Sequence, residues 1–251
     1  MEWHDTGFVL AARRYGESGV IVELLTRDHG RHAGLVRGGQ SPRLRAVLQA
    51  GNEVAAVWRG RLIEHLGTLT CEILRAHSAQ ILDDPDRLAA LTAAAALVAA
   101  ALPEREPHPD VFASFAALLA ALDSATDWPV RYVGWERDLL AALGFGLNLT
   151  RCALTGATTD LAYVSPRTGR AVSREAGLPY RDKLLVLPNF LWRDASADGG
   201  EIILGLGLTE HFLMHHVFLP QGRTLPAARR RLAERLRRQA GADKLSVPVR
   251  G

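Results

Sequence analysis

The sequence has little cysteine and almost no lysine, and each scarcity narrows the range of functions. Its 251 residues include two cysteines, Cys71 and Cys152, which are too few for a disulfide framework. Of its 30 basic residues, only Lys183 and Lys244 are lysines. Neither lysine stands in a glycine-rich phosphate-binding loop, so we do not expect ATP-driven work.

Long apolar runs and targeting signals are also missing. The longest apolar candidate, residues 88–102, is rich in alanine and too short to cross a bilayer, so it predicts a packed helix. The first ten residues do not combine a basic start with an apolar run, so no signal peptide is expected. With so few cysteines, the sequence predicts a cytoplasmic protein without a membrane partner.

The first 78 residues have the pattern of a small β domain. Five short segments rich in Val, Leu and Ile are separated by glycine-containing turns, at 8–15, 19–28, 31–39, 52–60 and 62–73. Because no long helix separates them, they predict a closed five-stranded barrel of the OB-fold type rather than a parallel sheet. Residues 41–49 are expected to form a short helical turn or a loop.

The remainder, 79–251, predicts an α-helical domain, which makes the fold class α+β. Apolar residues recur at helical spacing after Asp84-Pro85 and in the segments 109–125, 129–145, 200–219 and 225–239. Residues at about 150–180 return to short β-like pieces with many turn residues. They predict a small insert within the helical domain.

The insert has the spacing of a zinc ribbon without its ligands. Cys152 and Thr155 stand where one pair of cysteines would be, and Ser173 and Ala176 stand where the second pair would be. Threonine, serine and alanine cannot replace thiolates on zinc. We therefore expect a zinc-ribbon-like insert without zinc, and no cofactor elsewhere in the chain.

Two histidines raise the alternative of a metal hydrolase. His211 and His215 are four residues apart and share one face of a predicted helix, which suits a shared metal ion. The zinc-protease pattern is absent, because Glu210 precedes the first histidine and Phe212 occupies the place of the base. Packed or surface histidines are the preferred interpretation, and we do not expect an enzyme.

Arginines are the most informative residues present. The net charge of +3 is divided unevenly, with +2 in 1–82, −4 in 83–170 and +5 in 171–251. Seven arginines in the barrel region are candidates for DNA binding: Arg13, Arg14, Arg27, Arg31, Arg37, Arg43 and Arg45. Arginines on a barrel face and in a loop can neutralise a phosphate backbone, and Gly38 and Gly39 are expected to let a ligand approach closely. The alternative is an ordinary solvated strand face.

The C-terminal segment carries a second basic group. It contains Arg229, Arg230, Arg231, Arg235, Arg237 and Arg238, with an apolar stripe of Leu225, Leu232 and Leu236. Two interpretations stay open: an amphipathic closing helix with its polar face in water, or a second contact with a polyanion or an acidic partner protein.

Several segments together resemble one family. The ordered set begins with GFVLAARRYGESGVIVELLTRDHGRHAGLVRGG and LQAGNEV. It continues with LDDPDRLAAL, YVGWERDLLAALGFGLNLTRCALTG, YVSPRTGRAVS, LTEHFL and LPAARRRL. This ordered set resembles the RecO family of bacterial DNA repair and recombination mediators over nearly the whole chain.

The resemblance implies an N-terminal OB-fold, a helical C-terminal domain and no catalytic residues. It implies binding to single- and double-stranded DNA and annealing of complementary strands. It further implies partnership with RecR and with the acidic C-terminal tail of the single-stranded-DNA-binding protein, and thereby help in loading RecA. The alternative is a protein-interaction adaptor whose contact with DNA is secondary.

Overall fold

The structure, a computed structural model, describes residues 1–245 and contains two compact units. The first unit comprises residues 1–125 with 226–229, and the second comprises 126–225 with the chain from Arg230 onward. Residues 246–251, the end of the predicted helical domain, lie outside the described residues.

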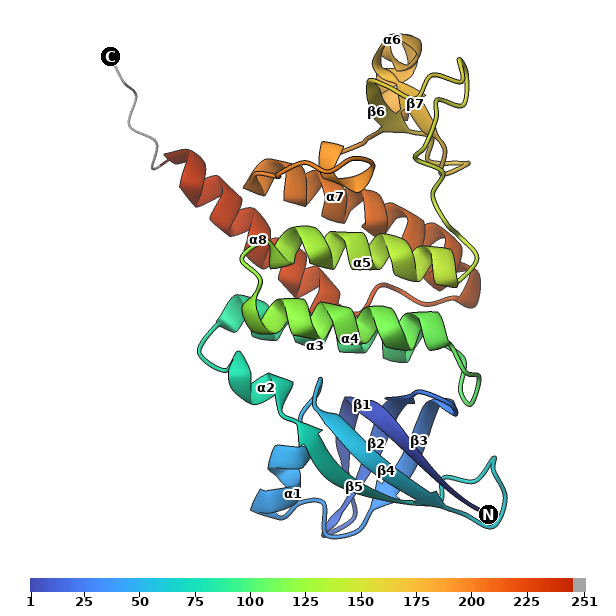
Figure 1. The fold of residues 1–251 in the computed structure, drawn as a ribbon, viewed down its shortest axis with the longest axis vertical. Coiled ribbons are helices and arrows are strands. Elements are labelled where there is room, and N and C mark those ends of the chain that lie inside the picture. The colour runs from blue at the N-terminus through green and yellow to red at the C-terminus, as the bar shows by residue number, and fades with distance from the viewer. Residues whose placement is uncertain (246–251) are drawn as a thin grey trace. The chain divides into compact units, whose positions relative to one another are not determined.

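The first unit begins with the predicted five-stranded barrel (Figure 1). Its strands are β1 (Glu2–Tyr15), β2 (Gly19–Thr26), β3 (Gly30–Val36), β4 (Glu53–Arg59) and β5 (Thr68–Arg75), with α1 (Pro42–Val47) between β3 and β4. They close in the order β1-β2-β3-β5-β4, antiparallel except where Leu35 of β3 meets Thr68 of β5. A closed barrel of five strands with a helix between the third and fourth is the OB-fold, as predicted.

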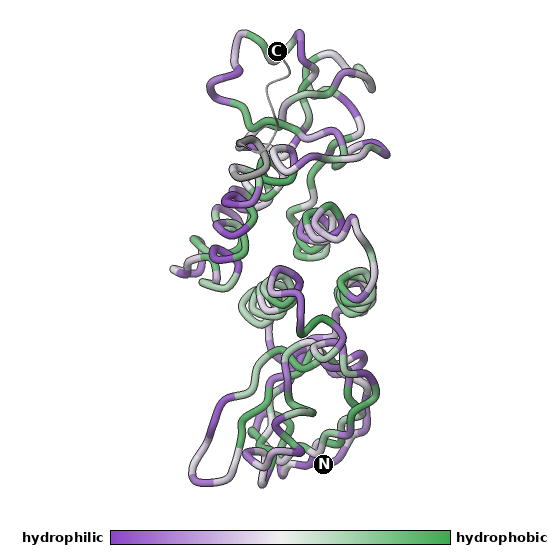
Figure 2. The backbone as a smooth tube through the Cα atoms, turned by 90° about the vertical axis from the view of Figure 1, so that its left-hand side faces the viewer, coloured by the Kyte–Doolittle hydropathy of each residue, from purple (hydrophilic) through white to green (hydrophobic). Residues whose placement is uncertain are grey.

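The barrel closes around alternating apolar residues. Val22, Leu24, Val54 and Trp58 are fully buried in its core, while the alternate residues Glu23, Ala55 and Val57 are more exposed. Figure 2 shows this alternation of hydrophobic and hydrophilic residues around the barrel. The two-residue period places one set of side chains inside and the other outside, which is why the strand pattern was readable from the sequence.

Three helices complete the first unit: α2 (His77–Gln80), α3 (Pro85–Ala101) and α4 (Pro109–Ser124). The Asp84 carboxylate caps α3 by accepting hydrogen bonds from the backbone of Asp86 and Arg87 at 3.0 and 3.1 Å. Phe112 of α4 packs 5.0 Å from Phe8 of β1, between ring centroids. The last strand of the barrel ends at Arg75, and the first compact unit continues beyond it to include these helices.

The second unit contains α5 (Trp128–Ala142) and α7 (Gly199–Phe212), and α8 (Ala227–Leu245) runs through its last part. After α7 the chain continues in a π-helical segment, Leu213–Phe218, and a 3-10 turn, Leu219–Gln221. Thr209 of α7 donates a hydrogen bond of 2.5 Å to the buried Glu136 of α5. A Cβ on Gly205 would lie 2.9 Å from Val133, so the glycine lets α7 pack closely on α5.

One helical stretch corrects the expectation about membrane-length segments. Gly199–Gln221 is long and apolar enough to cross a membrane by length and composition, with a mean hydropathy of 1.4. The sequence pattern underestimated it because polar residues such as Glu210 and His211 interrupt the apolar run. About 44% of the most apolar stretch is buried inside the fold. Core helices of globular proteins have the same composition.

The insert is a small three-stranded sheet in the order β7-β6-β8. Its elements are β6 (Leu161–Val164), β7 (Ala171–Ser173), α6 (Arg174–Gly177), a 3-10 helix at Leu178–Lys183, β8 (Leu185–Val186) and a 3-10 turn at Asn189–Leu191. This confirms the predicted β insert between the helices.

Candidate nucleic-acid interface

The strand register divides the seven barrel arginines between two ends of the barrel. Val20 of β2 lies opposite both Arg14 of β1 and Val36 of β3, so Arg14 and Arg37 reach the same end. At the other end Thr26 pairs with Gly30 and Leu25 pairs with Arg31. We call the first the open end, although Leu44 and Val47 of α1 pack against the barrel core there, and the second the helix-covered end because it meets α3, α4 and the loop between them.

The open end holds five of the predicted arginines. They are Arg13 and Arg14 of β1, Arg37 in the turn after β3, and Arg43 and Arg45 of α1; all five are exposed. Among the described residues, no carboxylate forms an ion pair with any of them. No neighbouring carboxylate therefore balances their charge, and an anion can reach them from solvent.

Helix α1 forms at this position because Ser41 and Pro42 start it. The Ser41 hydroxyl accepts a hydrogen bond from the Leu44 backbone at 3.5 Å, and Pro42 supplies the φ angle of a first helical residue. No acidic residue occupies the first turn of the helix, so nothing in that turn offsets Arg43 and Arg45.

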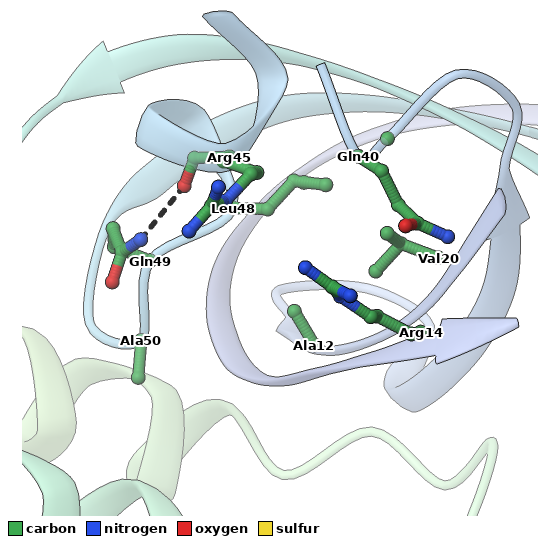
Figure 3. A pocket seen from close by; sticks show the side chains of 9 residues that line it. Ala12, Arg14, Val20, Gln40, Arg45, Leu48, Gln49 and Ala50 are labelled. Atoms are coloured by element: carbon green, nitrogen blue, oxygen red, sulfur yellow. Dashed lines mark hydrogen bonds between the residues drawn. The ribbon is translucent and has the colours of Figure 1, made fainter. Parts of the chain in front are cut away.

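Two cavities flank this group. One, of about 320 Å³, is lined by Arg14 and Arg45, which extend from β1 and α1 toward the same space (Figure 3). The other, of about 300 Å³, is lined by Arg37 and by Leu44 of α1. Arg13 precedes Arg14 on the same strand, so its side chain leaves the opposite face of β1. The open end thus offers arginines around two depressions rather than a flat strip.

The helix-covered end uses its arginines differently. Arg31 forms ion pairs with Glu23 and, at 3.5 Å, with Glu104, and its Nε donates to the Leu102 carbonyl at 3.0 Å. Its side chain is only 14% exposed. Arg27 lies 5.5 Å from the ring centroid of Phe112. Arg31 therefore ties the barrel to the α3–α4 loop and is not placed to contact a phosphate.

The two predicted glycines are not equivalent. Gly38 has a φ of +65°, which only glycine adopts without strain, and the space beside it is open. A Cβ on Gly39 would lie 2.8 Å from the Val20 side chain. Gly39 thus lets its loop rest on the barrel core, a role different from the expected approach to a ligand.

A buried histidine at the helix-covered end was not visible in the sequence pattern. His32 is 2% exposed, packs edge-on against Trp3 and Trp58, and has no hydrogen-bond partner for either ring nitrogen within the described part of the chain. Burial, together with the nearby Arg105 charge, lowers the pKa of His32 to about 4. A histidine in a strand gives no signal of its burial until the neighbouring strands are placed.

The C-terminal arginines lie on α8, but one of them faces the core. Leu225, just before α8, and Leu232 and Leu236 within it are buried, as the amphipathic pattern predicted. Arg229 is fully buried, so it is not available for the predicted polyanion contact. The exposed members are Arg230, Arg231, Arg237 and Arg238, and Arg235 is half-buried.

The insert holds Cys152 by hydrogen bonds. The Ser173 hydroxyl donates to its Sγ at 3.4 Å. Burial alone would raise the pKa of the Cys152 thiol, but hydrogen bonds from Ser173 and Thr155 outweigh it and lower the pKa to about 6. Thr155 and Ser173, which stand at two of the ligand positions of a zinc ribbon, thus contact the cysteine directly.

The paired histidines bind protein carbonyls. His211 Nε2 lies 3.2 Å from the Pro166 carbonyl oxygen, and His215 Nδ1 lies 2.8 Å from that of His211. Burial lowers the pKa of His211. Among residues 1–241, whose side chains the structure describes, we find no group of three or more His, Cys, Asp or Glu side chains that could hold a metal ion.

These features define the chain as a two-unit OB-fold protein with a helical second unit and a small β insert. The family described as Recombination protein O N terminal matches residues 1–77, and Recombination protein O C terminal matches 82–224. The chain belongs to the RecO family of DNA repair and recombination proteins.

Curated relatives agree over nearly the full length. The DNA repair protein RecO of Rhodospirillum rubrum is 53% identical over 251 residues, covering 97% of this chain and 100% of the relative. That of Rhodospirillum centenum is 55% identical over 240 residues, covering 95% and 96%. That of Phenylobacterium zucineum is 52% identical over 240 residues, covering 94% and 98%.

Proposed function

We propose that this protein binds single- and double-stranded DNA through the open end of its barrel. The observation that carries the proposal is the group of exposed arginines around α1 that have no ion-pair partner within the part of the chain that the structure describes: Arg13, Arg14, Arg37, Arg43 and Arg45. Arginine forks suit phosphate oxygens, and a rigid barrel holds them in fixed positions. Because phosphates are the same in every sequence, binding of this kind tolerates any sequence.

We infer that the protein also anneals complementary strands, because annealing requires that DNA be held and changes none of its covalent bonds. A surface that neutralises two backbones lowers their mutual repulsion, so complementary strands can pair without catalysis. Membership of the RecO family supports partnership with RecR and with the acidic tail of the single-stranded-DNA-binding protein, and hence help in loading RecA. We propose that this takes place in the cytoplasm, and that the exposed arginines of α8 are a second contact for an acidic partner.

A salt titration tests the DNA proposal. A fluorescent 20-nucleotide single strand is titrated with the protein at several salt concentrations, and annealing of complementary strands is followed without ATP. The triple variant Arg14→Ala, Arg37→Ala, Arg45→Ala should bind about 100- to 1,000-fold more weakly at low salt. Its salt slope should fall by about 2, because each phosphate contact with a single strand contributes about 0.7.

The matched control removes the same charge from paired arginines. Arg59, Arg131 and Arg174 are exposed and paired with Glu2, Asp127 and Asp160. Their triple alanine variant should bind within about threefold of the unchanged protein, since each charge removed is already balanced locally. An equal loss in both variants would show that net charge, not the open end, governs binding. Absence of DNA binding at low salt would contradict the proposal and favour the alternative, a protein-interaction adaptor.

A further inference from the structure

The cavity at the open end is lined by both charged and apolar side chains. Arg14 and Arg45 line it together with Ala12, Val20 and Leu48 (Figure 3). Val20 and Leu48 belong to the barrel core and are 6% and 4% exposed. A surface that only gathers phosphates needs no apolar lining. This combination suits a ligand with an anionic part and a flat apolar part.

A volume of about 320 Å³ is at the lower end of the range for small-molecule pockets, which is the size class of one nucleotide. A continuous duplex cannot fill it, because its bases are paired and stacked and only its backbone reaches a surface. A single strand can turn one base outward at a modest unstacking cost.

Gln40 also lines the cavity and offers a polar group to the edge of a base. The Gln40 amide nitrogen donates to the Gly16 and Gly19 carbonyls, at 3.1 Å each. These bonds fix the side chain and leave its amide oxygen as a hydrogen-bond acceptor at the cavity. Every DNA base carries at least one N–H donor on its pairing edge, so a lone acceptor does not select one base.

We propose that this cavity accepts one unstacked nucleotide of single-stranded DNA. The phosphate lies on Arg14 and Arg45, and the base lies against Ala12, Val20 and Leu48. The inference rests on the proposed function and adds a ligand class and a preference to it. Single strands gain a contact with the base, whereas duplexes use only the arginines outside the cavity.

The test compares strands that have bases with strands that lack them. The full-length protein is titrated with a fluorescent 20-nucleotide thymidine strand, an abasic strand of equal length and charge, and a 20-base-pair duplex. The thymidine strand should bind about fivefold or more tightly than the abasic strand. This comparison uses the unchanged protein and does not depend on the folding of any variant.

A variant then locates the base. Ala12→Phe fills the cavity and keeps every arginine, so it should reduce thymidine-strand binding to the abasic level and leave abasic-strand and duplex binding within twofold. Ala46→Phe adds the same ring at an exposed position of α1 that does not line the cavity, and should preserve the fivefold difference.

The outcomes separate this inference from the proposed function. Equal binding of thymidine and abasic strands by the unchanged protein would overturn the nucleotide cavity while keeping DNA binding. If Ala12→Phe weakened all three ligands alike, the cavity would hold phosphate alone, which also overturns the inference. Absence of binding to every strand at low salt would overturn the proposed function itself.

Discussion

The two ends of the barrel use the same residue type in opposite ways. At the open end Arg14, Arg37 and Arg45 are exposed and lack a carboxylate partner among the described residues. At the helix-covered end Arg31 is 14% exposed, paired with Glu23, and bonded to a carbonyl of the α3–α4 loop. Only the first arrangement leaves charge available for a polyanion.

The comparison shows that the density of arginine in a sequence does not by itself define a site. Arg31 and Arg37 are six residues apart on and after one strand, which carries them to different ends of the barrel. An arginine that meets a glutamate inside the fold stabilises the fold, whereas one that meets water can bind a ligand.

The largest expected effect on stability comes from breaking the partly buried ion pair of Arg31 and Glu23. Arg31→Ala leaves Glu23, which is 17% exposed, without its cation and should lower the free energy of unfolding by about 2–4 kcal/mol. Arg37→Ala at the open end should change it by less than about 0.5 kcal/mol. Urea unfolding of both variants measures the difference. Similar values for the two would remove the distinction between the ends.

An intermediate effect is expected on the pH dependence of stability, through His32 at the helix-covered end. The pKa of His32 is about 4 in the fold and near the ordinary histidine value of 6.5 in the unfolded chain. Between these values the unfolded chain binds a proton that the fold does not, so stability is complete above pH 6.5 and falls as the pH decreases. The loss for this group between pH 7 and pH 5 should be about 2 kcal/mol.

Urea unfolding at pH 7 and pH 5 measures this loss, and His32→Leu supplies the control. The leucine fills the same apolar position and cannot be protonated, so the pH dependence should be smaller by about 2 kcal/mol. If the variant lost stability with acid as steeply as the unchanged protein, other groups would be responsible.

The smallest expected effect comes from a substitution that weakens α1 at the open end and removes no charge. Ser41→Ala deletes the side-chain cap of α1, whose hydrogen bond of 3.5 Å is long, and should lower the free energy of unfolding by about 0.5 kcal/mol. Because α1 carries Arg43 and Arg45, DNA affinity should fall by less than about threefold. Ser18→Ala in the exposed β1–β2 turn is the matched control, and equal affinities for both variants would show that the cap does not position these arginines.

Much of the fold was predictable because periodicity is local. The strands at 19–26 and 53–59 and the helices at 109–124 and 128–142 follow from apolar spacing and turn residues, within a few residues of their observed bounds. The first strand begins earlier than expected, at Glu2, because it also pairs with β4. That pairing joins segments about 50 residues apart, and no local pattern indicates it.

The sequence predicted which type of residue makes up the candidate site, but not which of those residues are exposed. The sequence indicated seven arginines in the barrel, but it could not separate Arg31, which meets Glu23 and Glu104, from Arg37, which meets solvent. It also counted Arg229 with its exposed neighbours, although the fold buries it. Burial of one charged residue in a basic helix depends on what packs against that turn of the helix.

The sequence by itself determined the barrel, the helices, the insert and the family. Hydrophobic periodicity and turn chemistry act over a few residues and can be read along the chain. Tertiary structure alone decided which arginines lack a carboxylate partner and where the cavity between β1 and α1 opens. It also decided that His32 is buried without a hydrogen-bond partner, as far as the described residues go. Strand register and side-chain packing depend on distant segments, because charge and burial are set by neighbours in space rather than in sequence.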